Sequence, residues 1–253
     1  MKIGIITDIH SNIDALKAVF KEFKEKNIDK VICLGDIIGI GPYSHECTKF
    51  LIEKKDMMIS WILGNHERYL IDGIPKTHHS IPNGTKTRKI EYACYEWNHS
   101  QLTIEENEFL KSRPIEDTLY IEGLKIVIEH YPYNASHEFA GYYNSPSFDE
   151  VRNLFRCKDA NIYIYGHTHE RCINEKNNVI YINPGSVGCP LNTNKALYGV
   201  LDINNGKYEY RSYEAEYDIK KVIKDIENLG YPMYGFMVWR FYDKTYEYDD
   251  SKY

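Results

Sequence analysis

Short apolar runs that each end at a carboxylate, amide or imidazole side chain are the feature that most constrains how this chain folds. The first three runs cover residues 2–7, 31–34 and 58–63. Amphipathic segments separate them, and one of these has apolar residues at helical spacing behind Asn12, which can cap a helix. An alternation of strand and helix of this kind predicts an α/β fold built on a layered sheet.

The second half of the chain has further apolar runs that predict strands, at residues 118–121, 124–129, 162–165, 179–182, 197–203 and 207–213. Turns are predicted at Gly123 and Gly206, because glycine permits the backbone conformations that tight turns need. We expect these strands to form an antiparallel or mixed sheet packed beside the first. A capping-box pattern at Ser147 predicts another helix, and a last helix over residues 218–229 should end at Gly230.

Two segments depart from this pattern of strands. Residues 71–118 are polar and rich in loops, with helices predicted across 87–97 and behind the capping box that begins at Thr103, so we interpret them as an insertion or cap. Residues 231–253 form an aromatic and then acidic tail, which we expect to pack against the body of the protein or against a second copy. The prediction is one catalytic domain over residues 1–230, followed by this tail.

Composition excludes several classes of protein. The apolar runs are shorter than the ~20 residues that a membrane span needs, and Asp8 and His10 interrupt the stretch that a secretion signal would keep apolar. The six cysteines are scattered without C-x-x-C spacing, which is typical of reduced thiols, so we expect a cytoplasmic protein. A formal net charge of -6 provides no overall attraction for long nucleic acid.

The side chains that follow the apolar runs are of the types that commonly bind metal ions. They are Asp8, His10, Asp36, Asn65, His130, His167 and His169. In α/β sheets, residues at the carboxyl ends of neighbouring strands meet in one crevice even when they are distant in sequence. We therefore expect these side chains to converge. Imidazoles and carboxylates with one amide oxygen and no thiolate favour Mn, Fe, Zn or similar ions over soft-metal or iron–sulfur chemistry.

The order and spelling of these motifs resemble those of the calcineurin-like metallophosphoesterases: Asp8-Ile9-His10, Gly35-Asp36, Gly64-Asn65-His66-Glu67, His130 and Gly166-His167-Thr168-His169. The resemblance covers roughly residues 1–205, and the loop at 183–188 is similar to that of the small prokaryotic phosphodiesterases in this family. It implies a two-sheet α/β sandwich of the metallophosphoesterase type, with a small helical and loop insertion.

The resemblance also implies which side chains hold each ion. The first ion is assigned to Asp8, His10, Asp36 and His169, and the second to Asp36, Asn65, His130 and His167, so that Asp36 bridges the pair. The implied cofactors are two divalent metal ions, with Mn expected first and Fe, Zn, Ni or Co as alternatives. A metal-bound hydroxide would attack phosphorus, and His66 would act as general acid or as hydrogen-bond donor to the transition state.

Two residues depart from the usual family motifs. Glu67 stands where aspartate is commoner, and Tyr131 follows His130 where glycine is usual. Both departures leave the proposed ligands intact. Tyr131 is a candidate to line the substrate site or stack on a base, with packing on the sheet edge as the alternative. Arg68 is a candidate to bind a second phosphate, with an ordinary surface charge as the alternative.

The predicted activity is metal-dependent hydrolysis of small phosphate esters, as a phosphodiesterase or phosphatase, with nucleotides among the candidate substrates. One alternative is a hydrolase of dinucleoside polyphosphates such as diadenosine tetraphosphate. A protein phosphatase is disfavoured by the compact length of 253 residues. A binding scaffold that has lost its metal is disfavoured because every proposed ligand is present. Assembly into a homo-oligomer stays open.

Overall fold

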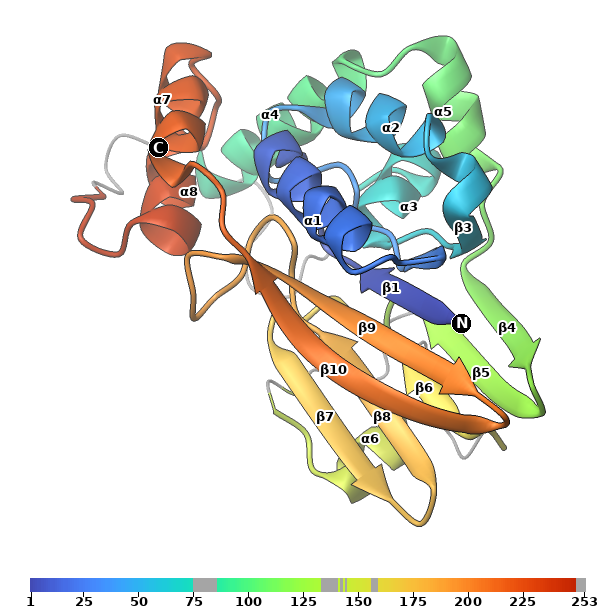
Figure 1. Cartoon of the computed structure of the whole chain (residues 1–253). Coiled ribbons are helices and arrows are strands. Elements are labelled where there is room, and N and C mark those ends of the chain that lie inside the picture. The colour runs from blue at the N-terminus through green and yellow to red at the C-terminus, as the bar shows by residue number, and fades with distance from the viewer. Residues whose placement is uncertain (75–85, 133–140, 142, 144, 156–158, 249–253) are drawn as a thin grey trace.

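The computed structural model describes residues 1–74, 86–132, 141, 143, 145–155 and 159–248. Two five-stranded sheets pack face to face (Figure 1). The order in the first sheet is β10-β9-β1-β2-β3, and the order in the second is β4-β5-β6-β8-β7. The acidic residues at 249 and 250 and part of the predicted insertion lie outside the described residues.

The first sheet contains the strands that the opening alternation predicts: β1 (Lys2–Ile6), β2 (Lys30–Cys33) and β3 (Met58–Trp61), with β9 (Ala196–Asn204) and β10 (Lys207–Ala215). Strands β1, β2 and β3 are parallel, with Ile6 opposite Cys33, whereas β9 runs antiparallel to β1. Helices α1 (Ile13–Glu25) and α2 (Ser44–Ile52) and the 3-10 turn η1 (Lys55–Met57) connect them. The side chain of Asn12 accepts a hydrogen bond from the backbone N–H of Ala15, which confirms the predicted helix cap.

The second sheet is mixed. Its strands are β4 (Glu116–Ile121), β5 (Leu124–Glu129), β6 (Ile162–Ile164), β7 (Arg171–Lys176) and β8 (Val179–Pro184), and helix α6 (Phe148–Leu154) packs on its outer face. Strand β6 pairs in parallel with both β5 and β8, whereas β4 and β7 are antiparallel edges. The carboxyl ends of β5 and β6 therefore point to the same edge of the sheet.

The core between the sheets is built from β-branched and leucine side chains that alternate along the strands: Ile3, Ile5, Ile32, Leu34, Ile62, Leu124, Ile126, Ile128, Ile162, Ile164, Ile180, Ile182, Leu201 and Ile203. A second apolar layer lies between the first sheet and helices α1 and α2. Burying both faces of each central strand explains their near-continuous apolar sequence. The arrangement is the two-sheet α/β sandwich expected from the sequence.

Two details of the sheets differ from the sequence prediction. Strands β9 and β10 extend the first sheet beside β1 and do not join the second, because β9 forms backbone hydrogen bonds with β1. Strand β7 was not predicted, since its sequence RCINEK has polar residues at most positions and its side chains are largely accessible. Its pairing with β8 is what makes it a strand.

Helices α3 (Asn65–Asp72), α4 (Lys86–Ser100) and α5 (Ile104–Lys111) follow β3. The predicted capping box is confirmed, since Thr103 Oγ1 accepts from the N–H of Glu106, and Glu106 Oε2 accepts from the N–H of Thr103. In the part of the chain that the structure describes, no helix is long and apolar enough to span a bilayer.

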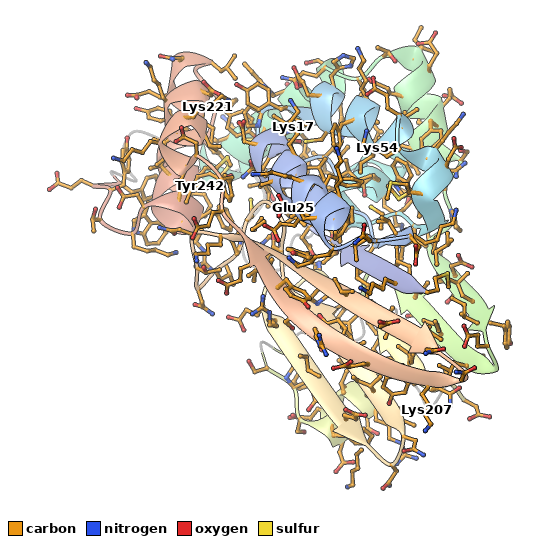
Figure 2. The ribbon with its side chains drawn as sticks, viewed as in Figure 1. Lys17, Glu25, Lys54, Lys207, Lys221 and Tyr242 are labelled. Carbon is orange, nitrogen blue, oxygen red and sulfur yellow. The ribbon has the colours of Figure 1, made fainter. Side chains whose placement is uncertain are left out.

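The C-terminal segment folds back on the body. Helix α7 (Ile219–Asn228) is followed by α8 (Tyr234–Met237) (Figure 1) and by a π-helical turn, η2 (Val238–Tyr242). Apolar side chains of these elements pack with those of α4. Lys221 of α7, labelled in Figure 2, forms an ion pair with Asp14 of α1, with 2.8 Å between Nζ and Oδ2. The aromatic residues of this segment therefore lie against the same polypeptide.

Candidate metal centre

The loops that follow β1, β2 and β6 carry ligand-type residues in an unusual backbone conformation. Asp8, His10, Asp36, His167 and His169 have φ angles of 52°, 48°, 50°, 71° and 61°. Left-handed backbone of this kind costs about 1–3 kcal/mol per non-glycine residue and persists only where surrounding contacts enforce it. Two such contacts join the first loop to the second, where the N–H groups of Asp8 and His10 donate to the carbonyls of Gly35 and Asp36.

Glycines let these loops approach one another. A Cβ atom on Gly64 would lie 2.1 Å from Oδ1 of Asp36, and one on Gly166 would lie 2.2 Å from Oγ1 of Thr7. Both distances are far inside van der Waals contact. The glycines that precede the ligands in the sequence therefore serve close packing between the loops.

One group of side chains gathers Asp8, His10 and His169. Nε2 of His10 lies 2.9 Å from Nε2 of His169, and Oδ1 of Asp8 lies 3.7 Å and 3.4 Å from these two nitrogens. The other oxygen of Asp8 accepts hydrogen bonds from Oγ1 of Thr7 and from the backbone N–H of His167. The carboxylate is thus held in one orientation, with Oδ1 directed at the two rings.

A second group gathers Asp36, Asn65, His130 and His167. Nε2 of His130 lies 3.2 Å from Oδ2 of Asp36 and 3.2 Å from Oδ1 of Asn65. Nδ1 of His167 lies 2.9 Å from the same Asn65 oxygen. Oδ2 of Asp36 also lies 3.8 Å from Nε2 of His10, so Asp36 is the side chain that both groups share. The structure brings together all the residues that the sequence proposed as ligands.

The donor set fits a cation. Nδ1 of His130 and Nδ1 of His169 each lie 2.8 Å from a backbone carbonyl, of Leu34 and Cys189, and can donate to it. When the rings are neutral, this tautomer leaves a lone pair on each Nε2, and Nε2 of His130 faces the oxygens of Asp36 and Asn65. Oδ1 of Asp8 is buried without a hydrogen-bond partner among the described residues. Acceptors that converge in this way require positive charge between them.

The pKa shifts of Asp36, His167 and His169 favour the protonation states that bind metal ions. Burial opposes ionisation of Asp36, but His130 and His66 hold the pKa of its carboxyl well below the usual range. Burial lowers the pKa of His167 to about 3 and that of His169 to about 4. Burial also opposes protonation of His130, but Asp36 outweighs it and raises the pKa of this ring to about 9. An ionised carboxylate and neutral rings are the forms that bind metal ions, and a cation would displace the proton of His130.

His66 lies beside both groups. It is the second residue of α3, and its backbone N–H donates to Oδ1 of Asp36 over 2.8 Å. Its ring packs edge-on against that of His10, with 4.8 Å between centroids, and faces Tyr95 at 5.6 Å. Burial lowers the pKa of His66 to about 3, so the ring is neutral at neutral pH and can donate an N–H hydrogen bond.

Glu67 has a structural role that the sequence analysis missed. Its buried carboxylate accepts four backbone hydrogen bonds, from Asp36 at 2.8 Å, Ile37 at 2.7 Å, Ile38 at 3.1 Å and Gly64 at 2.9 Å. It therefore ties the loop after β2 to the start of α3. The signal in the sequence is a carboxylate placed directly after Asn65 and His66, which the family motif presents only as a departure from aspartate.

The two substrate-binding candidates occupy different environments. Tyr131 is 1% exposed, and its ring packs against that of His167 with 5.1 Å between centroids. It therefore packs behind His167, one of the candidate metal ligands. Arg68 is partly exposed on α3, where Nη2 lies 3.2 Å from Oδ2 of Asp72. Binding of substrate by either residue stays a prediction.

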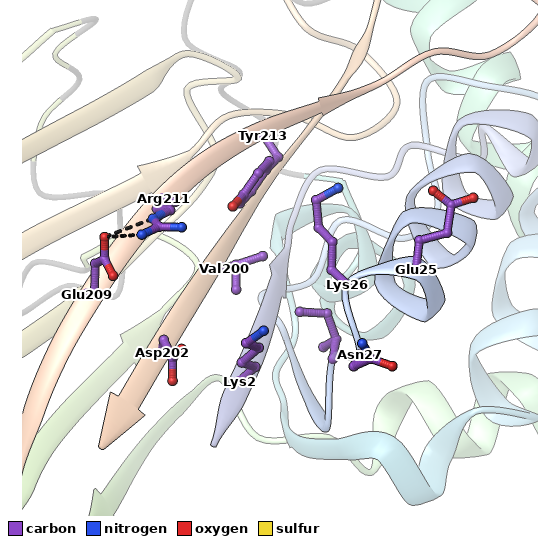
Figure 3. Close-up of a pocket in the computed structure, with 10 residues that line it drawn as sticks. Lys2, Glu25, Lys26, Asn27, Val200, Asp202, Glu209, Arg211 and Tyr213 are labelled. Atoms are coloured by element: carbon purple, nitrogen blue, oxygen red, sulfur yellow. Dashed lines mark hydrogen bonds and ion pairs between the residues drawn. The ribbon is translucent and has the colours of Figure 1, made fainter. Parts of the chain in front are cut away.

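A cavity of about 310 Å³ elsewhere on the first sheet contains none of the proposed site residues. It is lined by residues of β1, α1, β9 and β10, and Arg211 in it is paired with Glu209 (Figure 3). Lys2, Glu25, Glu209 and Arg211 of this cavity are exposed to solvent, whereas Asp8, Asp36 and His130 of the candidate metal centre are buried.

Comparison with known proteins agrees with the geometry. The model of the calcineurin-like phosphoesterase superfamily domain matches residues 1–206. The uncharacterized protein MJ0912 of Methanocaldococcus jannaschii is 32% identical over 240 residues, covering 88% of this chain and 91% of that protein. Phosphodiesterase MJ0936 of the same organism is 25% identical over 216 residues, covering 85% and 100%. A metallophosphoesterase structure from Sphaerobacter thermophilus shares the fold, with a TM-score of 0.69 at 22% identity over 95% of this chain and 97% of that one.

Proposed function

Because this chain belongs to the calcineurin-like phosphoesterase superfamily, and is therefore a hydrolase of phosphate esters, we propose that it acts on small substrates at a dinuclear metal centre. The observation that supports the proposal is the pair of ligand groups joined at Asp36. One group would be Asp8, His10, Asp36 and His169, and the other Asp36, Asn65, His130 and His167. The name of MJ0936, a phosphodiesterase, supports diesters as the first substrates to test.

Divalent cations bound by these residues would polarise the phosphate oxygens and activate water, and Mn is the ion we would test first. The chain's own groups orient the reaction around them. The carbonyls of Leu34 and Cys189 fix the tautomers of His130 and His169, and Glu67 fixes the loop that carries Asp36. His66, neutral and next to the shared carboxylate, would donate an N–H hydrogen bond to a phosphate or leaving-group oxygen.

The activity is tested by turnover of bis(4-nitrophenyl) phosphate and 4-nitrophenyl phosphate with purified protein. We expect hydrolysis that requires added Mn or a similar divalent ion and stops with chelator. The ratio of the two rates separates a diesterase from a monoesterase. Turnover that is unchanged by chelator, or its absence across diesters, monoesters and dinucleoside polyphosphates, would contradict the proposal.

Ion binding should also stabilise the fold, because a cation offsets the repulsion among the converging acceptors, including that between the carboxylates of Asp8 and Asp36. A ligand at 100 times its dissociation constant adds about 2.7 kcal/mol, which for a domain of this size raises Tm by roughly 5–10 °C. Differential scanning fluorimetry with Mn and with chelator measures this shift. The shift should shrink in His169→Gln and persist in His45→Gln, since His45 lies on α2 and pairs with Glu106. Equal shifts in the two variants would place the ions elsewhere.

A further inference from the structure

A cavity of about 680 Å³ opens beside His66, between α4 and the C-terminal segment. Six aromatic side chains line it: Tyr95, Tyr231, Phe236, Trp239, Phe241 and Tyr248. Trp239 and Tyr248 stack with 5.7 Å between ring centroids and an interplanar angle of 19°. We name this cavity the aromatic pocket. Its volume lies in the range of pockets that bind organic ligands.

The aromatic pocket adjoins the metal centre through two shared residues. His66 lines the pocket and also lies next to His10 and Asp36, with candidate ligand atoms of the three within 4.8 Å of one another. Phe241 lines it from the C-terminal segment, and its ring centroid lies 6.0 Å from that of His169. A phosphate ester whose phosphorus sits at the metal centre would therefore extend its organic group toward this pocket.

We propose that the aromatic pocket binds a planar aromatic group of the substrate, which makes the protein selective for aryl or nucleoside phosphate esters. The inference rests on the proposed function and specifies its substrate class. The described lining residues include no lysine or arginine, and Glu91 adds a carboxylate, so the pocket does not suit a second phosphate. Rings arranged around an apolar space instead favour stacking and edge contacts with another ring.

Buried polar contacts hold the wall of the pocket in place. Asn98 of α4 donates through Nδ2 to the hydroxyl of Tyr231 over 3.1 Å, while its Oδ1 accepts from the N–H of Gly39 and the hydroxyl of Ser44. The hydroxyl of Tyr242 donates to the carbonyl of Gly188 over 3.3 Å. These bonds connect α4, the C-terminal segment and the loops of the metal centre, so the pocket is part of the folded body.

The test measures binding without turnover. Isothermal titration calorimetry compares phenylphosphonate with methylphosphonate on the Mn-loaded full chain, since these ligands differ only in the organic group. We expect phenylphosphonate to bind roughly tenfold or more tightly, because the ring loses contact with water in the pocket. A parallel comparison of AMP with ribose 5-phosphate tests whether the aromatic group that binds in the pocket is a nucleobase. A gain for AMP indicates a nucleobase, and a gain confined to phenylphosphonate indicates an aryl ester.

Two variants locate the effect. Trp239→Ala removes one wall and Met233→Trp fills the space, and either should reduce the phenyl advantage to about threefold or less while leaving methylphosphonate affinity unchanged. Tyr120→Ala is the matched control, because Tyr120 is a 74% exposed aromatic residue on β4. Equal affinity for both phosphonates, or an advantage that survives in both pocket variants, overturns the proposal. If neither phosphonate binds, the proposed metal centre is contradicted as well. If methylphosphonate binds and phenylphosphonate does not, only the proposal for the aromatic pocket is contradicted.

Discussion

Replacing Asp36 with asparagine is expected to lower kcat/KM by roughly 1000-fold, since ion-mediated stabilisation of transition-state charge amounts to several kcal/mol and each 1.4 kcal/mol is tenfold. Asp36 is the side chain common to both ligand groups, at 3.2 Å from His130 and 3.8 Å from His10. Asparagine keeps the size of the side chain and an oxygen for the N–H of His66, but it removes the charge that two cations would share. Steady-state kinetics with saturating Mn measures the loss.

Asp202→Asn is the control, because Asp202 is a partly exposed carboxylate on β9 whose nearest ionic partner is the N-terminal amine at 3.9 Å. This variant should keep wild-type turnover. Metal content should fall in Asp36→Asn and stay constant in Asp202→Asn, as measured by inductively coupled plasma mass spectrometry. Near-wild-type turnover of Asp36→Asn with a full complement of ions would contradict the bridging role.

Replacing Glu67 with glutamine should destabilise the fold by about 2–4 kcal/mol, because an NH₂ group would then face backbone N–H donors that lose their acceptor. The Glu67 carboxylate is not one of the proposed metal ligands. It positions Asp36 through the hydrogen bonds to the backbone of residues 36–38 and Gly64. Activity should fall roughly 10–100-fold, the range typical of residues that orient metal ligands. Glu67→Asp, which keeps the charge, should lose less than either Glu67→Gln or Asp36→Ala.

Glu106 provides a matched control for Glu67. Both are buried glutamates at the third position of a helix, and both accept a backbone N–H there, but Glu106 belongs to α5 and contacts Thr103 and His45. Glu106→Gln should reduce stability in chemical denaturation and leave kcat/KM of the remaining folded protein intact. A positioning role for Glu67 predicts loss of both quantities together with weaker Mn affinity. Equal kinetic behaviour of the two variants would reduce Glu67 to a purely structural residue.

The sequence predicts where the strands and the ligand motifs lie along the chain, because each is encoded by neighbouring residues. Each apolar run predicts a strand from its own residues, and parallel strands in an α/β sheet present their carboxyl ends at one edge. For this reason the sequence alone predicts that Asp8, Asp36, Asn65, His130 and His167 lie in one crevice. The capping boxes at Thr103 and Ser147 were equally local, and both are confirmed by hydrogen bonds.

Other features depended on contacts between distant residues. The polar sequence of β7 becomes a strand through its pairing with β8, and β9 joins the first sheet because its register with β1 buries Leu201 between the sheets. The residues of β7 and β9 alone do not show that β7 is a strand or which sheet β9 joins. The aromatic residues after Tyr231 likewise suggested packing, without indicating that they would form a pocket beside His66.

By itself, the sequence determined the α/β class, the positions of the central strands along the chain and the identity of the residues that gather at their ends, because side-chain periodicity and motif spacing are properties of the local chain. The tertiary structure decided how those residues face one another. Left-handed backbone at Asp8 and Asp36, the amide contacts of Glu67 and the aromatic pocket all require hydrogen bonds or packing between segments far apart in the chain. Such contacts arise only when the sheets and the C-terminal segment are assembled.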